Sequence, residues 1–249
     1  MRHPDRDILN IGQFITALKE SRDGANHPIW YRGQDRAAWS LIPGIGRPGN
    51  NIAAELATIK RFKQSASQYL PNRPTDDWEW IFLMQHHRAP TRLLDWSESS
   101  LVGLFFAVQN PVHDDHPAAV WCLDPIDLNK KSGHNRAFEL DILAFGIDRV
   151  LDNYLPDRIN ERVDRLAPIA AIGPRNSPRM VAQAGTFTVI HAEATSIEAV
   201  GDQSHIWRLV IPAAERSNMR EELKLLGISE HSLFPDLDRV ALLAKGLVA

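Results

Sequence analysis

The chain has little of what secreted and membrane proteins need. Its 249 residues contain one cysteine, Cys122, so no internal disulfide can form and a cysteine-based zinc site is excluded. Cys122 lies in an apolar, strand-like run, so we expect a buried side chain rather than a nucleophile. The longest strongly apolar run, LVGLFFAV at 101–108, is far shorter than the roughly 20 residues that cross a bilayer. The amino terminus lacks the apolar core of a signal peptide, and we expect a cytoplasmic protein with no membrane partner.

An excess of charge of one sign is also missing. The chain has 28 Lys and Arg against 31 Asp and Glu, a formal net charge of −3, which disfavours strong non-specific nucleic-acid binding. No HExxH motif and no spaced cluster of His and Asp occurs, so no metal is expected. Repeats, low-complexity tracts and linkers rich in Gly, Ser or Pro are absent too. Residues 1–249 are therefore expected to form one domain, whose 44% hydrophobic content can fill a sizeable core.

The periodicity of apolar residues changes along the chain. Apolar residues three and four apart predict a helix over 7–21 with an acidic N-cap. The other predicted helices of the first half are 51–70, 75–87 with Thr75 or Asp76 as its cap, and 100–110, with a strand at 29–34 and a loop at 88–96. The second half is predicted to hold strands at 118–123, 168–172, 186–190 and 206–211, with helices near 137–154, 178–184, 213–226 and 236–245. Helices first and strands later predict an α+β domain with a helical N-terminal part and a mixed or antiparallel sheet that forms a cleft.

The strand-like stretch WYRGQ is the first place that concentrates chemistry. Arg32 and Gln34 fall on one face of the strand. Gly33 removes the side chain between them, which allows a ligand or another backbone to come close. Arginine presents a planar fork of donors suited to phosphate or carboxylate. Arg32 is therefore a candidate ligand-binding residue, with a structural ion pair as the alternative.

The stretch MQHHRAPTRLLDW is the second place. Adjacent histidines on a helix point about 100° apart, so His86 and His87 are not expected to bind one metal together. One of them is a candidate site residue, and His87 can equally be a residue favoured at a helix C-terminus. Arg92 and Asp95 follow the turn at Pro90, and at a spacing of three they can form an internal ion pair or contact a ligand directly.

The stretch NSPRMVAQAGTFTVI is the third place. Ser177 can cap a short helix with Pro178 at its first position, which carries Arg179 and Gln183. Gly185 is expected to end that helix and release the chain into a strand. A polar residue just before a buried strand often makes a loop hydrogen bond, so Gln183 has a structural alternative.

Together, the stretches YRGQ, QHHRAPTRLLDWS, PRMVAQAGTFT and ISEHSLFPDLDRVA resemble the FRG domain, a family of bacterial and phage proteins named for a Phe-Arg-Gly-type motif. The resemblance runs from about residue 30 to 244. Tyr31 stands in place of phenylalanine, a change that conserves shape. Arg88 stands where many members have glycine, which we expect to alter access to the site. No reaction is generally assigned to the family.

The order of these parts is also similar to that of ADP-ribosyltransferases, which assemble an NAD cleft from separate strands. Cleaving the bond between nicotinamide and ribose builds positive charge on the ribose, so donors must grip the diphosphate and the ribose hydroxyls. This resemblance implies Arg32, His86 and Gln183 as catalytic residues. The substrate-binding residues it implies are Tyr31, Gln34, Gln85, His87, Thr91, Arg92, Asp95 and Arg179.

A late glutamate steadies the charged ribose in many such transferases, and this chain departs from that pattern. No glutamate adjoins QAGTF, so Glu193, Glu198 and Asp95 are the candidates for this role.

Two functions stay open on this reasoning. The first is an enzyme with NAD as co-substrate, an ADP-ribosyltransferase or NAD glycohydrolase, acting as a toxin or phage-defence effector with a macromolecular acceptor or a cognate antitoxin as partner. The second is a non-catalytic module that uses the same cleft to sense a nucleotide or to hold a protein.

Overall fold

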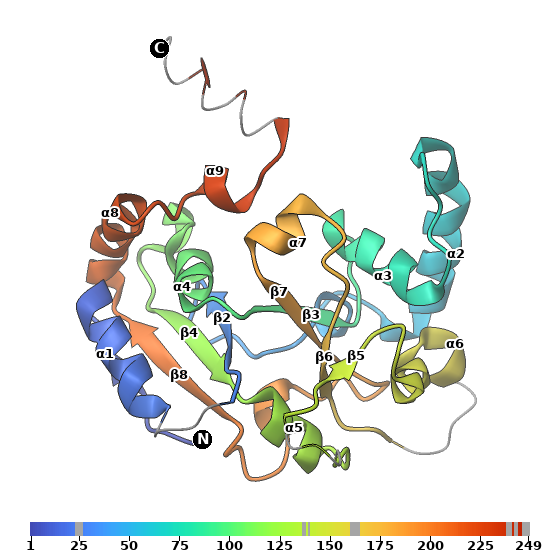
Figure 1. The fold of residues 1–249 in the computed structure, drawn as a ribbon, viewed down its shortest axis with the longest axis horizontal. Helices are drawn as coiled ribbons and strands as arrows, with labels where there is room; N and C mark the ends of the chain where they lie inside the picture. The colour runs from blue at the N-terminus through green and yellow to red at the C-terminus, as the bar shows by residue number, and fades with distance from the viewer. Residues whose placement is uncertain are drawn as a thin grey trace.

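A computed structural model describes residues 1–22, 27–135, 138, 140–159, 165–237, 241 and 244–245. Within these residues, eight strands form one open sheet in the order β1-β8-β4-β2-β3-β7-β6-β5 (Figure 1). The strands are β1 (Arg6–Asp7), β2 (Trp30–Gln34), β3 (Leu93–Ser97), β4 (Ala118–Leu123), β5 (Leu143–Ala144), β6 (Ile169–Ile172), β7 (Gly185–Val189) and β8 (Ile206–Ile211). Only the edge pairs β1 with β8 and β5 with β6 are parallel among the described strands. The chain has an α+β fold, as its sequence predicts.

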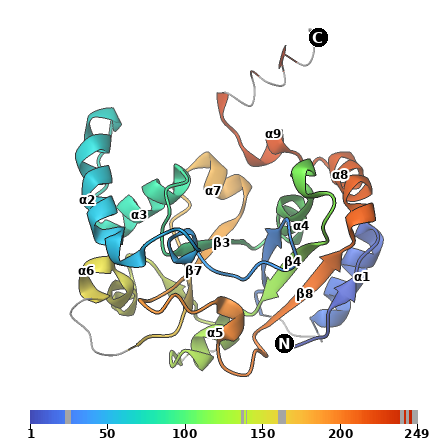
Figure 2. The same cartoon turned by 180° about the vertical axis from the view of Figure 1, so that it is seen from behind.

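The helices pack around this sheet (Figures 1 and 2). They are α1 (Ile11–Ser21), α2 (Glu55–Ala66), α3 (Asp77–His86), α4 (Ser100–Val108), α5 (Pro125–Lys131), α6 (Pro156–Ile159), α7 (Pro178–Ala182), α8 (Arg216–Leu225) and α9 (Glu230–Leu233), with short 3₁₀ turns between several of them. Among the described residues, none of these helices combines the length and the apolar character that a membrane crossing requires.

Side-chain caps fix where two of the predicted helices begin. The side chain of Asp76 accepts a hydrogen bond from the Glu79 backbone at 2.8 Å, so Asp76 is the N-cap of α3. Asn10, not an acidic residue, caps α1, because its side chain accepts from the Gln13 backbone at 2.9 Å. The predicted start at residue 7 is therefore wrong. Ile8 lies before the cap and its backbone N–H donates to Val210 of β8.

Two further predictions of secondary structure need correction. The predicted loop 88–96 contains most of β3, which is buried between β2 and β7. The predicted helix near 137–154 is instead strand β5 followed by a 3₁₀ turn at Arg149–Tyr154, in the part of this segment that the structure describes. Half of the predicted helix near 236–245, at 238–240 and 242–243, lies outside the described residues.

The sheet splits between β2 and β3. A single register pair, Tyr31 opposite Ser97, joins these two strands, whereas five pairs join β2 to β4 and five join β3 to β7. Figure 1 shows the half that contains β4 and β8 diverging from the half that contains β7 and β6. Backbone groups of β2 and β3 beyond the single pair therefore face a gap rather than a ladder of hydrogen bonds.

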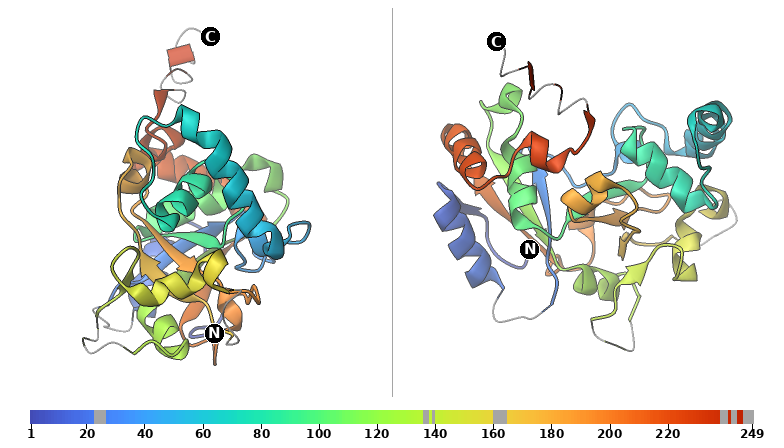
Figure 3. Two further views of the ribbon diagram at one scale, coloured as in Figure 1. Left: turned by 90° about the vertical axis from the view of Figure 1, so that its right-hand side faces the viewer. Right: turned by 45° about the horizontal axis from the view of Figure 1, so that its top comes forward.

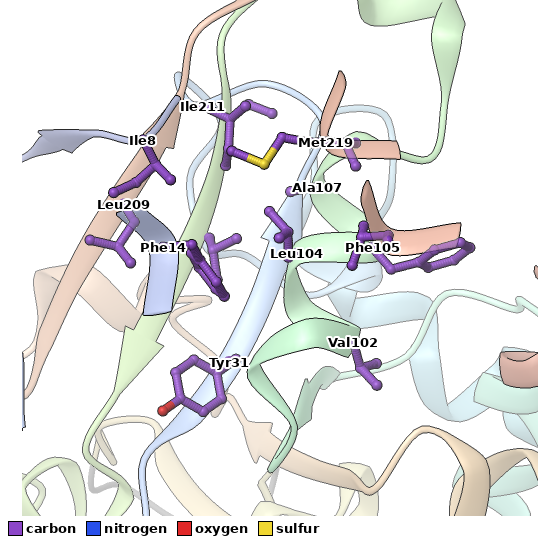
Figure 4. Close-up of a cluster of buried hydrophobic side chains, with 14 of the residues drawn as sticks. Ile8, Phe14, Tyr31, Val102, Leu104, Phe105, Ala107, Leu209, Ile211 and Met219 are labelled. Carbon is purple, nitrogen blue, oxygen red and sulfur yellow. The ribbon is translucent and has the colours of Figure 1, made fainter. Parts of the chain in front are cut away.

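Three clusters of buried apolar side chains hold the two halves. On one face, α1, α4 and α8 pack on β2, β4 and β8, with Phe14, Tyr31, Leu104 and Met219 among the buried residues (Figure 4). A second cluster joins α3 to β3, β6 and β7. The third cluster, on the opposite face, joins loop residues to β2, β3 and β4. Figure 3 shows α4 and α3 over different halves of the sheet, with α7 between them.

Candidate functional site

A cavity of about 790 Å³ lies along the split of the sheet. Its volume falls within the range of small-molecule sites. Side chains from β2, β3, α3, α4 and α7 and from the loops 35–47 and 72–75 line it. Of the eleven residues predicted as site residues, nine line the cavity: Tyr31, Arg32, Gln34, Gln85, His86, His87, Asp95, Arg179 and Gln183. Thr91 and Arg92 do not.

Arg32 spans the split. Its Nη1 donates to the backbone carbonyl of Asp95 at 2.7 Å, so the side chain supplies a link where the strands have lost their ladder. Burial lowers the pKa of Arg32 to about 10, the nearby Asp95 opposes this shift and Arg47 adds to it. The guanidinium remains charged at neutral pH. Its Nε is buried and has no hydrogen-bond partner among the described residues.

Arg32 and Asp95 reach the cavity from opposite faces of the sheet. Tyr31 and Ser97 are opposite partners, so their side chains share a face. Counting by two along β3, the Asp95 side chain lies on that face, whereas the neighbour of Tyr31, Arg32, points to the other. A ligand in the split can therefore contact a cation and a carboxylate on different sides.

Gly33 is required by the fold rather than by a ligand. A Cβ at this position would lie 2.2 Å from the Ala107 nitrogen and 2.2 Å from the Gly103 oxygen. Of the two sequence alternatives, the close approach of another backbone is the one observed, because α4 packs directly on β2. This packing fixes the position of the neighbouring Arg32 backbone relative to α4.

Asp95 is the exposed carboxylate of the β3 part of the cavity. Its Oδ2 accepts a hydrogen bond from Nε2 of Gln85 at 2.9 Å. Gln85 is held in turn by Thr91, whose hydroxyl donates to Gln85 Oε1. Thr91 is 1% exposed, so its predicted contact with substrate is wrong and its role is to support Gln85.

Arg92 belongs to the core. Its side chain and that of Glu55 are each 2% exposed, and the two form a buried ion pair in which Nε of Arg92 also donates to Glu55 Oε1 at 3.2 Å. A further bond from Nη1 reaches the Ile190 carbonyl at 3.1 Å. The prediction that Arg92 binds substrate is therefore wrong, and so is its alternative pairing with Asp95, because Glu55 lies closer from α2.

His86 and His87 end α3 at the rim of the cavity. Both are exposed, and their rings meet edge to face with centroids 5.0 Å apart. His87 is the C-cap residue of α3, as one sequence alternative holds. Partial burial of the ring lowers the pKa of His86, Arg179 and His87 lower it further, and Asp236 opposes them. His86 is thus a neutral imidazole at pH 7, able to donate or accept one hydrogen bond.

Gln183 and Arg179 connect the cavity wall to the C-terminal part of the described chain. Nε2 of Gln183 donates to the Leu233 carbonyl at 3.0 Å, and its backbone carbonyl accepts from Ser97 Oγ at 2.6 Å. The Arg179 guanidinium lies over the Phe234 ring, 4.8 Å from its centroid. One donor of Gln183 is therefore already engaged by the fold.

The end of α7 differs from the sequence prediction. Ser177 caps the helix by accepting from the Met180 backbone at 3.2 Å, as predicted. Ala184, not Gly185, adopts the left-handed conformation that ends it, with φ of 45°. Gly185 opens β7, where a Cβ would lie 2.7 Å from the Met180 side chain.

Tyr31 and Gln34 line the cavity with groups that the fold already uses. Burial raises the pKa of Tyr31 to about 12, so its phenol stays protonated. Gln34 is 6% exposed, its Oε1 accepts from Trp121 Nε1 at 2.8 Å and its Nε2 donates to the Ser40 carbonyl at 3.2 Å. Both residues shape the wall.

The two late glutamates lie outside the cavity lining. Glu193 forms an ion pair with Arg165, and the carboxylate of Glu198 accepts from the Leu41 backbone at 3.1 Å. Of the three acidic candidates, Asp95 is the one that the cavity contains.

Sequence reasoning missed several polar and aromatic residues of the wall, and five of them carry a charge or a large exposed ring. They are Asp35, Trp39, Arg47, Arg73 and Glu79. Burial raises the pKa of Asp35 against the opposing effects of neighbouring groups. Trp39 is 45% exposed, which is unusual for so large a ring, and only its exposure in the folded chain marks it out.

The described part of the chain contains neither a cluster of candidate metal ligands nor an accessible thiol. No group of three or more His, Cys, Asp or Glu side chains within the described ranges is placed to hold a metal ion. Cys122 is fully buried in β4, and burial raises the pKa of its thiol well above the usual range, which keeps it protonated.

The fold and the cavity define an α+β protein with a cavity, lined by both polar and apolar side chains, where its sheet splits. The FRG domain family model matches residues 27–116, a segment that includes β2, α3, β3 and α4. No curated protein and no solved structure matches the chain. The stretches at 178–188 and 228–241 lie outside the matched segment. The likeness to ADP-ribosyltransferases therefore rests on the order of the residues alone.

Proposed function

We propose that the cavity binds a nucleotide, with NAD as the candidate, and that the chain cleaves the bond between nicotinamide and ribose. The observation that carries this proposal is the buried Nε of Arg32, which lacks a partner among the described residues and belongs to a side chain in a cavity of about 790 Å³. A buried donor without a partner costs free energy, and an anionic oxygen relieves that cost on binding.

A dinucleotide fits the distribution of charge around Arg32. Arg47 lines the same cavity and is close enough to lower the pKa of Arg32, so two guanidinium groups can face one diphosphate. The exposed Trp39 ring at the same cavity offers a surface on which a base can stack.

Asp95 supplies the negative charge that the chemistry requires. As the C1′–N bond of NAD breaks, its electron pair leaves with neutral nicotinamide and the ribose becomes an oxocarbenium ion. The Asp95 carboxylate stabilises this ion, and Arg32 and the rim residue His86 hold the remainder of the substrate. Water, or a nucleophile of a macromolecular acceptor, then bonds to C1′ and loses its proton. The products are nicotinamide and either ADP-ribose or an ADP-ribosylated acceptor.

A non-catalytic nucleotide-sensing or protein-interaction module is the second candidate. It is favoured by the hydrogen bonds that two predicted catalytic residues make within the fold, from Arg32 to the Asp95 carbonyl and from Gln183 to the Leu233 carbonyl. In that case the cavity holds a ligand and its occupancy changes how the sheet halves meet.

The decisive experiment measures nicotinamide release from NAD by the purified protein, with and without cell lysate, beside a calorimetric NAD titration. Turnover that Asp95→Asn removes and that the exposed control Asp115→Asn retains supports the enzyme. Binding without turnover in both arms supports the sensing module. The absence of both binding and turnover refutes NAD as the ligand. Turnover found only with lysate points to a macromolecular acceptor, as expected for a toxin or phage-defence effector, and a lysate component that suppresses it behaves as a cognate antitoxin.

A further inference from the structure

Gln85 lies at the centre of a chain of hydrogen bonds that ends on Asp95. The Leu93 backbone N–H donates to Thr91 Oγ1 at 3.2 Å. Because that bond occupies an acceptor site of the hydroxyl, the Thr91 proton is free to point at Gln85 Oε1, to which it donates. The Gln85 amide nitrogen then faces Asp95 Oδ2 at 2.9 Å and the Leu93 carbonyl at 3.4 Å.

This chain leaves the Gln85 amide one orientation. A flipped amide would place its oxygen against the Asp95 carboxylate and the Leu93 carbonyl, and its NH₂ group against the Thr91 hydroxyl. The amide oxygen of Gln85, an acceptor, would then face two other acceptors and no donor. The Leu93 carbonyl and the Asp95 carboxylate therefore determine which end of Gln85 meets Asp95, and the buried hydroxyl of Thr91, 1% exposed, holds the other end by donating to it.

The bond also determines how Asp95 presents its carboxylate. Oδ2 is engaged by Gln85, whereas Oδ1 accepts no hydrogen bond from the described residues, so the bond holds one oxygen and leaves the other for a ligand. Phe187, opposite Asp95 in β7, and Phe82 pack with ring centroids 5.0 Å apart and both line the cavity. An apolar wall beside the carboxylate strengthens its attraction to a developing positive charge.

We propose that Gln85 is a positioning residue for Asp95, and that Thr91 anchors the other end of Gln85. The proposal rests on the proposed function, because it assigns Asp95 to the charged ribose. Gln85 contributes by restricting the rotation of Asp95 about its side-chain bonds, so that Oδ1 faces the substrate before the bond breaks. Thr91 acts one step further from the substrate.

The test compares Gln85→Leu, Gln85→Glu, Thr91→Val and Thr91→Ser with Gln64→Leu, a matched change on the exposed side of α2. We expect Gln85→Leu to lower kcat by about 100-fold, with a much smaller change in KM. Thr91→Val should lower kcat in the same direction, and Thr91→Ser should recover it because the hydroxyl remains. Gln85→Glu places a second carboxylate beside Asp95, so the acidic limb of the rate profile should move to higher pH.

A purely structural role predicts a different pattern. Thr91→Val and Gln85→Leu would then lower the melting temperature and leave kcat per folded molecule and the pH profile unchanged, which would overturn the proposal. A second readout needs no turnover. In protein labelled with ¹³C at the aspartate carboxyl, Gln85→Leu should move and broaden the Asp95 carboxyl signal at neutral pH, because the carboxylate loses a donor and rotates more freely.

The two proposals fail separately. A wild-type protein that releases no nicotinamide refutes the proposed function, whatever the labelled carboxyl does. An Asp95 carboxyl signal that Gln85→Leu leaves unchanged refutes the positioning role, even in an active enzyme.

Discussion

Replacement of Arg32 by lysine separates a ligand-binding arginine from a structural one. Lysine keeps the positive charge but presents a point charge instead of a planar fork. One donor of the Arg32 fork is used in the structure and another is not. Nη1 bonds the Asp95 carbonyl across the split, whereas the buried Nε has no partner among the described residues. A ligand oxyanion that uses Nε and Nη2 together cannot be matched by one ammonium group.

The expected loss of affinity follows from these contacts. A hydrogen bond to a charged group contributes about 1.5–3 kcal/mol, which corresponds to a dissociation constant weaker by about 10- to 150-fold in Arg32→Lys. Arg32→Ala should bind more weakly still. For stability, lysine loses the bridge to Asp95 but also removes a buried donor that has no described partner, so the free energy of unfolding should change by about 1 kcal/mol or less.

The assay combines urea denaturation, an NAD titration and nicotinamide release for wild type, Arg32→Lys, Arg32→Ala and the exposed control Arg61→Lys on α2. Weakened binding with an unchanged denaturation midpoint supports the ligand role. If the denaturation midpoint of both Arg32 variants falls, alanine more than lysine, and affinity falls only in proportion to the unfolded fraction, Arg32 is a structural bridge and the argument from its unpaired Nε is wrong.

Three other predictions concern residues outside the cavity lining. Arg92→Met should destabilise the chain by about 3–5 kcal/mol by leaving the Glu55 carboxylate buried alone, and the double variant with Glu55→Leu should recover most of the loss in urea denaturation; a double variant no better than the single one contradicts this. Arg88→Gly should increase the free energy of unfolding by about 1 kcal/mol or less and so raise the melting temperature, because Arg88 has a φ of 62° that glycine adopts at little cost. An unchanged or lower melting temperature contradicts this. Burial lowers the pKa of His205, whose Nε2 bonds the Ile197 carbonyl, so the unfolded chain takes up this proton first as the pH falls. The free energy of unfolding should therefore fall as the pH drops from about 6.5 through the folded pKa. His205→Gln should flatten that slope in melting curves, and an equal slope in the variant refutes this prediction.

Local patterns in the sequence predict the elements that depend on local chemistry. The apolar run within 75–87 and the acidic residue Asp76 at its start identify α3, because an N-cap acts within one turn of the helix that follows it. The strand at 29–34 is also recovered, and so is the run AAVWCL, since continuous burial of β4 inside the sheet leaves a continuous apolar run.

β3 shows what local patterns do not contain. The residues LLDWS include a charged side chain and follow Pro90, which together indicate a loop. They form a strand because β7 pairs with all five of them in register from a sequence distance of about 90 residues. The ion pair of Arg92 also depends on a contact between residues far apart in sequence. Its partner Glu55 lies in α2, whereas Asp95, three residues away, is only the carboxylate nearest in sequence.

The positions of the cavity residues could be predicted better than their roles. Nine of the predicted residues line the cavity because the strands and helices that carry them converge at the split. Gln34 and Arg92 look like donors for a ligand in the sequence, yet their donors and acceptors are consumed by Trp121 and Glu55. Whether a polar group is free depends on partners that only the folded chain brings near.

The polar residues of MQHHRAPTRLLDW lie between two apolar runs because the segment crosses from the core to the cavity. Arg92 is buried on one side of it, and Asp95 is exposed on the other, three residues later. Between them, Thr91 and Gln85 join the buried side to the exposed side through hydrogen bonds. A change that shifts the buried end of this segment therefore shifts the carboxylate as well. For this reason, variants of Arg92 should be compared at equal folded fraction before any loss of activity is assigned to the site.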